Sequence, residues 1–69
     1  MQNNVFGKRL RELRIERELT QRQLGEVLNV WNQTVSFWET GKREPDLDTL
    51  VRIAHYFDVP IEYLLENKD

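Results

Sequence analysis

Apolar residues recur three and four positions apart along most of the 69-residue chain, which is the spacing of one buried face of an α-helix. The first series begins after Asn3 and Asn4, either of which can cap a helix, and runs to about Arg17. Its inward members are Phe6, Leu10 and Leu13. No segment shows the alternation of apolar and polar residues that predicts a strand. The pattern therefore predicts a helix here and an all-helical chain.

A capping pattern marks the second helix. Thr20 followed three residues later by Gln23 is a capping box, which predicts a helix that begins at Gln21. Asn29 tolerates a positive φ because its side chain is short and polar, so it is predicted to end this helix. The predicted inward members are Leu24, Val27 and Leu28.

Three further helices follow in the same way. A turn of about three residues leads to a third helix at about 31–40, which Gly41 ends. Asp46 is predicted to cap a fourth helix, and Pro60 to open a fifth. The inward residues of these helices are Val35, Trp38, Leu47, Leu50, Ile53, Ala54, Phe57, Ile61, Leu64 and Leu65. We expect an all-α, compact bundle of five short helices in a single domain, residues 1–69.

Composition narrows the class of protein. The chain has no cysteine and a single histidine, His55, so we expect no metal site and no cofactor. No apolar run approaches the roughly 20 residues of a membrane span, which predicts a cytoplasmic protein with no membrane partner. An enzyme is not expected, because the sequence offers no Gly-rich phosphate loop and no cluster of acid and base side chains.

The net charge of −2 argues on its own against a polyanionic partner. However, the charge is unevenly distributed along the chain. Residues 1–43 hold eight basic and five acidic side chains, whereas residues 44–69 hold two basic and seven acidic ones. Such asymmetry between halves can mark one face for nucleic acid and another for solvent or a protein partner.

The predicted third helix has two different sides. At about 100° per residue, Val35 and Trp38 lie within about 60° of each other and point inward. A different arc of about 140° carries Asn32, Gln33, Ser36 and Phe37. Most exposed helix faces are polar because they meet water, but this arc lacks the usual Glu and Lys residues. Its amides and hydroxyl are groups that bind the edges of DNA bases.

The segments "GKRLRELR", "LTQRQLGEVLNV", "QTVSFWETGKREP" and "LDTLVRIAHYFDVPIEYLL" follow one another over most of the chain. Together, from about Phe6 to Leu65, they resemble the helix-turn-helix domains of the phage Cro and CI repressors and their Xre-like bacterial relatives. The helix-turn-helix motif itself corresponds to about residues 21–40. Its W-E-x-G-x-x-x-P tail makes the resemblance specific.

The resemblance implies a sequence-specific regulator of transcription, with repression expected, that binds double-stranded DNA at a near-palindromic operator as a homodimer. The third helix, about 31–40, would read the major groove. The implied base contacts are Asn32, Gln33, Ser36 and Phe37. The implied phosphate contacts are Gln21, Trp31, Thr34, Thr40, Lys42 and Arg43, with Arg9 or Arg11 as further candidates. Arg14 and Glu39 match a pair that links the first helix to the third, and we hypothesise that the pair orients the recognition helix.

Two positions depart from the family. Trp31 stands where Ser or Thr usually caps the third helix, and its spacing from Val35 and Trp38 favours packing at the rim of the core over a phosphate contact. Phe37 stands where Arg, Lys or Gln is common. Its ring could contact a thymine methyl, which we favour, or anchor a protein partner, or be simply exposed.

Other departures lie at helix ends, where Glu18, Asn29 and Asp58 replace Gly and are expected to take positive φ. His55, Tyr56 and Tyr63 lie off the apolar stripes, and we interpret them as surface residues, with a dimer contact as the alternative. A second function stays open. The net acidity and the aromatic residues are also compatible with a protein-interaction or antitoxin-like module that binds DNA weakly or not at all.

Overall fold

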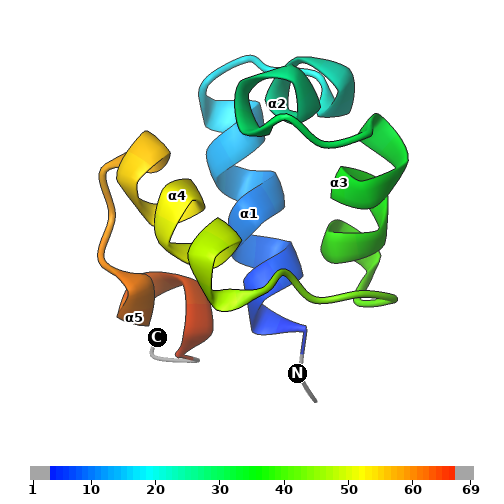
Figure 1. The fold of residues 1–69 in the computed structure, drawn as a ribbon. Helices are drawn as coiled ribbons and strands as arrows, with labels where there is room; N and C mark the ends of the chain where they lie inside the picture. Colours follow the sequence, from blue (N-terminus) through cyan, green and yellow to red (C-terminus); the bar gives the residue numbers. More distant parts are fainter. Residues whose placement is uncertain (1–3, 67–69) are drawn as a thin grey trace.

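The computed structural model describes residues 4–66, which form five α-helices joined by short turns (Figure 1). They are α1 (Val5–Glu16), α2 (Gln21–Leu28), α3 (Asn32–Thr40), α4 (Leu47–Phe57) and α5 (Ile61–Leu65). No strand is present in residues 4–66, so the all-α prediction is confirmed. Asn3, the other predicted cap of the first helix, lies outside the described residues. None of the helices in this part of the chain is long and apolar enough to cross a bilayer.

The helices surround one apolar core, with α1 in the middle of the bundle. In Figure 1, α1 has α3 on one side and α4 and α5 on the other, while α2 lies across its C-terminal end. Every helix contributes to the core, which consists of Phe6, Leu10, Leu13, Leu24, Leu28, Val35, Trp38, Leu50, Ile53, Ala54, Phe57 and Leu64. Burying one large apolar side chain stabilises the fold by about 1.5–3 kcal/mol, so this core is the main source of stability.

Three residues predicted to lie inside are exposed. Val27, Leu47 and Leu65 have exposed fractions of 42%, 78% and 39%. Leu47 is the first residue of α4 and Leu65 is the last residue of α5. At these helix ends the neighbouring parts of the chain do not cover the two side chains. In α2 the inward positions are already filled by Leu24 and Leu28, and Val27 is turned to the edge of that face.

The predicted caps of α2 and α4 are present. Thr20 Oγ1 accepts a hydrogen bond of 3.0 Å from the N–H of Gln23, whose side chain accepts one of 2.8 Å from the N–H of Thr20. At α4, Asp46 Oδ1 accepts from the N–H of Thr49 at 2.9 Å. Hydrogen bonds from the side chain and backbone of Thr49 lower the pKa of Asp46, and the charge of Arg52 adds to this effect.

The expected positive φ values are also found. Glu18, Asn29 and Asp58 have φ of 59°, 61° and 56°. Asn29 ends α2 and Asp58 ends α4, as predicted. Asn4 also has a positive φ, of 48°, which was not predicted. Asn4 is the N-cap residue of α1, as one of the two predicted alternatives, but its side chain makes no capping bond.

Candidate nucleic-acid interface

The inward side of α3 is fixed against the rest of the bundle, with most of the bonds over its C-terminal half. Val35 and Trp38 are buried on this side as predicted, and the Trp38 ring meets the edge of Phe6 at a centroid distance of 6.4 Å. The backbone of α1 passes so close that a Cβ on Gly7 would lie 2.5 Å from the carbonyl oxygen of Trp38. Asn4 Nδ2 donates a hydrogen bond of 3.1 Å to the carbonyl oxygen of Glu39. The side chain of Asn4 therefore binds α3 and makes no capping bond to α1.

Arg14 and Glu39 form a two-bond ion pair on this anchored side. Arg14 Nε lies 2.7 Å from Glu39 Oε2, and Arg14 Nη2 lies 3.1 Å from Oε1. The side chains are only 12% and 4% exposed. Arg14 Nη1 also donates to the carbonyl oxygen of Leu19 at 2.8 Å, in the turn before α2. A carboxylate buried this deeply needs a cation and full hydrogen bonding, and both are supplied here.

Gln21 joins the same carboxylate from the start of α2. Its Nε2 donates to Glu39 Oε1 at 3.1 Å, so Glu39 connects α1, α2 and α3. The sequence assigned Gln21 to phosphate and did not foresee this bond. An amide carries two N–H groups and a carbonyl oxygen, so one N–H remains for an anion at the positive end of α2.

The outward side of α3 carries no such bonds. Asn32 and Gln33 are exposed, and within the described residues neither side-chain amide has a hydrogen-bond partner. Thr34, Ser36 and Phe37 are half-buried. The helix therefore presents unused donors and acceptors on its outward side and is anchored on its inward side.

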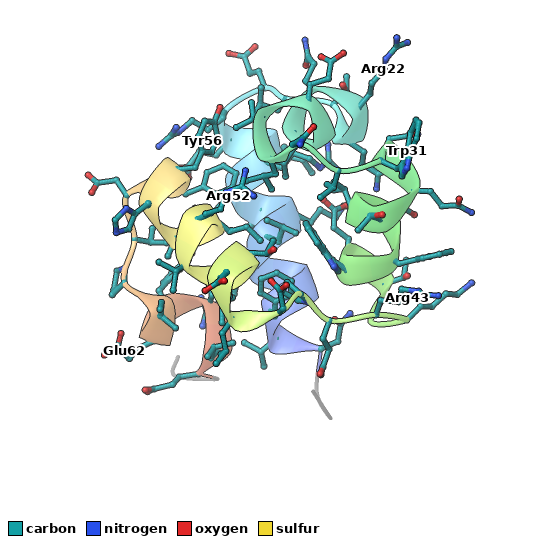
Figure 2. All side chains as sticks on the ribbon, viewed as in Figure 1. Arg22, Trp31, Arg43, Arg52, Tyr56 and Glu62 are labelled. Carbon is teal, nitrogen blue, oxygen red and sulfur yellow. The ribbon has the colours of Figure 1, made fainter. Side chains whose placement is uncertain are left out.

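Trp31 is not part of the core. Its side chain is 80% exposed, so packing at the rim of the core, which its spacing favoured, is wrong. Trp31 is the N-cap of α3 with extended backbone angles, φ −70° and ψ 149°, and helical spacing does not hold for a residue outside the helix. Its side chain makes no capping bond. In Figure 2 it projects away from the bundle, and it borders a shallow hollow that Arg22 also lines.

The loop after α3 brings two cations to the same side as Phe37. Gly41 ends the helix with φ 80°, and the N–H groups of Lys42 and Arg43 both donate to the carbonyl oxygen of Phe37, at 2.9 and 3.3 Å. Lys42 Nζ and Arg43 Cζ each lie 5.8 Å from the centre of the Phe37 ring. Thr40 Oγ1 donates to the carbonyl oxygen of Ser36 at 3.0 Å, so its hydroxyl proton is already used.

Other predicted surface residues have partners of their own. Arg9 lies over the ring of Tyr63, 4.7 Å from its centre, at the contact of α1 with α5. Arg17 lies 5.4 Å from the centre of the Tyr56 ring. These aromatic residues therefore hold arginines in place, which no short-range sequence pattern indicated. His55 is exposed on α4.

Known proteins resemble this chain in sequence and in fold. The profile of the helix-turn-helix family matches residues 10–64. The HTH-type transcriptional regulator ImmR of Bacillus subtilis is 41% identical over 60 residues, covering 87% of this chain and 47% of ImmR. The cryptic phage CTXphi transcriptional repressor RstR of Vibrio cholerae is 31% identical over 65 residues, covering 94% of this chain and 59% of RstR. The chain thus spans about half the length of these relatives.

Solved structures agree. The P22 c2 repressor protein, determined in complex with a synthetic operator, superposes with a TM-score of 0.84 at 28% identity, covering 91% of this chain and 96% of that one. A transcriptional regulator from Listeria innocua gives a TM-score of 0.84 at 34% identity, covering 93% of this chain and 60% of that one. The predicted resemblance to Cro and CI-type domains is confirmed, and the chain belongs to the helix-turn-helix family.

Proposed function

We propose that this protein is a sequence-specific, double-stranded-DNA-binding regulator of transcription, a repressor, which reads the major groove with α3. The main support is that Asn32 and Gln33 are exposed and without hydrogen-bond partners within the described residues, on a helix whose inward side is held by Val35, Trp38 and Glu39. Such side chains bond base edges, and a fixed helix presents them in one orientation. The P22 c2 repressor, which has this fold, was solved with an operator.

The proposed contacts follow from position. Base contacts are assigned to Asn32, Gln33, Ser36 and Phe37 at the exposed side of α3. Phosphate contacts are assigned to Gln21, Trp31, Thr34, Thr40, Lys42 and Arg43, which flank this side in the chain. For Thr40, the contact requires its hydroxyl to release the hydrogen bond to the carbonyl oxygen of Ser36 and to donate to the phosphate, because phosphate oxygens only accept. We propose that Arg14 and Glu39 fix the angle at which α3 enters the groove.

We further propose a homodimer on a near-palindromic operator, with half-sites about one DNA turn apart. The proposed activity is binding without catalysis, in the cytoplasm. Because each phosphate neutralised contributes a slope of about 0.9 in the logarithm of affinity against that of salt, affinity should fall steeply with salt.

Selection of binding sites from a randomised duplex library tests this function. The expected result is an enriched inverted repeat, which reports specificity, symmetry and half-site spacing together. If several rounds at low salt enrich no sequence, the function proposed here is wrong.

A second function is supported by the exposed aromatic at the start of α3. Trp31, at 80% exposure, is a suitable anchor for a protein partner, so the alternative is an interaction or antitoxin-like module on this scaffold. Titration with random duplex at low salt, followed by tryptophan fluorescence, separates the two. A change in emission together with a mobility shift favours DNA binding, whereas no response in either measurement favours the protein partner.

A further inference from the structure

Phe37 lies at the junction between the recognition helix and the basic loop. Its half-buried ring has two cations near it, Lys42 Nζ and Arg43 Cζ, each 5.8 Å from the ring centre. A cation within about 6 Å of the face of an aromatic ring is attracted by its electron density. Both charged side chains of the loop therefore lie close enough to the Phe37 ring to be attracted by it. A polar side chain at this position of α3 would not attract them in this way.

The backbone of the same residue fixes the loop. The carbonyl oxygen of Phe37 accepts hydrogen bonds from Lys42 and Arg43, and the positive φ of Gly41 turns the chain back toward it. Ring and carbonyl therefore act on the same two residues, the carbonyl on their backbone and the ring on their charged ends. The location of both charges depends on Phe37.

We propose that Phe37 is a positioning residue for the phosphate contacts of Lys42 and Arg43, beyond any contact of its own with a base. This inference rests on the proposed DNA-binding function. An arginine or lysine beside a ring still has N–H groups to donate to a phosphate. A side chain already held near its bound position loses less conformational freedom on binding, so affinity rises.

The two possible roles of Phe37, positioning of phosphate contacts and contact with a base, differ in how they depend on DNA sequence and on salt. Phosphate contacts carry no sequence information, so the contribution of Phe37 should appear on every duplex and should shrink as salt rises. A contact with a thymine methyl would instead matter only on sites with thymine at that position. Affinity for duplex of random sequence therefore distinguishes the two roles.

The first experiment measures the affinity of the chain for labelled random duplex at low salt by fluorescence anisotropy. We expect Phe37→Leu to weaken binding about 2- to 10-fold, corresponding to the loss of one or two exposed cation–aromatic contacts. Phe37→Tyr keeps the ring and should restore affinity to within about twofold of the parent chain. Ile15→Ala, which shortens a 53% exposed apolar side chain on α1, is the matched control and should bind like the parent. Unchanged random-duplex affinity in Phe37→Leu would overturn the inference.

A double-mutant cycle tests whether the ring acts through the two cations. In a chain carrying Lys42→Gln and Arg43→Gln, the further change Phe37→Leu should cost no affinity for random duplex, because nothing remains for the ring to position. A loss equal to that in the parent chain would show that Phe37 acts by another route. Thermal unfolding of each variant verifies that the fold is kept.

A readout without DNA keeps the two proposals separable. A ring placed beside Lys42 and Arg43 should shift the NMR signals of their terminal methylene protons upfield. This shift should persist in Phe37→Tyr and disappear in Phe37→Leu. If the parent chain binds duplex without the upfield shift, the positioning role alone is wrong. If it shows the shift but binds no duplex, the proposed function is wrong and the positioning role falls with it.

Discussion

The two sides of α3 are built in opposite ways. On the inward side, Val35 and Trp38 are buried and Glu39 bonds to α1 and α2. On the outward side, Asn32 and Gln33 have no hydrogen-bond partners within the described residues, and the side chain of the N-cap residue Trp31 makes no capping bond. Stability is therefore concentrated on one side of the helix, and the other side is left for a ligand. Mutations on the two sides should change different measured quantities.

Trp38→Ala should have the largest effect. The side chain is 4% exposed and packs against Phe6, so its loss leaves a cavity in the core. We expect the free energy of unfolding to fall by about 3–5 kcal/mol, which is enough to unfold much of a domain this small. Urea denaturation followed by circular dichroism measures it. A loss below about 0.5 kcal/mol, the range of a typical surface substitution, would contradict the assignment of this side of α3 to the core.

Arg14→Ala should come next. It leaves the carboxylate of Glu39, whose side chain is 4% exposed, without its cation, and removing one partner of a buried pair costs about 3 kcal/mol. Arg14→Lys keeps the charge but loses the two-bond geometry, so its effect should be intermediate. Because the pair also holds α3 in place, affinity for a selected duplex should fall in both variants. If melting temperature and affinity both stay unchanged in Arg14→Ala, the orienting role is wrong.

Asn32→Ala and Gln33→Ala should change affinity and leave stability alone. Both side chains are exposed, so the free energy of unfolding should move by no more than about 0.5 kcal/mol. Each truncation should weaken binding to the selected duplex by about 1–3 kcal/mol and relax preference at one base position. Mobility-shift titrations against a panel of single-base variants of the site measure both effects. Equal affinity of parent and variant for every duplex would remove these residues from the interface.

Trp31→Ser should raise the stability of the fold, whereas the substitutions at Trp38 and Arg14 lower it. The serine hydroxyl can accept from the N–H of Gln33 or Thr34 in the first turn, and little packing is lost because Trp31 is 80% exposed. We expect a gain of about 1 kcal/mol, or about 4–8 °C in Tm. If Trp31 donates its indole N–H to a phosphate, affinity for DNA should fall in the same variant. A lower Tm would mean that the indole contributes to stability after all.

The smallest expected effect is on the pH dependence of stability at α4, whose N-terminus is capped by the side chain of Asp46. The pKa of Asp46 is lowered from its usual 3.8 in the folded chain, so its stabilising contribution is present above that pH and is lost as pH falls through the lowered value. Asp46→Asn still caps α4 but cannot titrate, so its stability should fall less on acidification. Thermal unfolding at a series of acidic pH values measures this. Identical profiles for the two chains would contradict the cap assignment.

The sequence predicted the features that depend on local chemistry. The capping box of Thr20, the left-handed Asn29 and the buried side of α3 follow from short-range rules and from helical spacing. The ion pair of Arg14 with Glu39 was foreseen only through the family resemblance. Trp31 was misassigned because helical periodicity was extended to a residue before the helix. Leu47 was wrongly predicted to lie inside for a related reason, since helical spacing does not show whether the first residue of a helix is covered by the rest of the chain.

Contacts between residues far apart in the chain could not be predicted from the sequence. Asn4 bonds to the end of α3, 35 positions away, and Gln21 shares the carboxylate of Glu39. The close approach of Gly7 to Trp38 depends on how α1 crosses α3, which spacing along either helix does not specify. The proximity of Phe37 to both loop cations depends on the turn at Gly41.

The most direct test of the account is an NMR titration of the labelled chain with a selected duplex, following the backbone and side-chain amides. We expect the largest shifts to cluster at residues 31–37 and 40–43 and at Gln21, and the side-chain amides of Asn32 and Gln33 to become protected. The anchored residues Val35 and Trp38 should keep their core contacts. Shifts confined to α4 and α5, or none at saturating duplex, would contradict the claim that the exposed side of α3 is the DNA-reading surface.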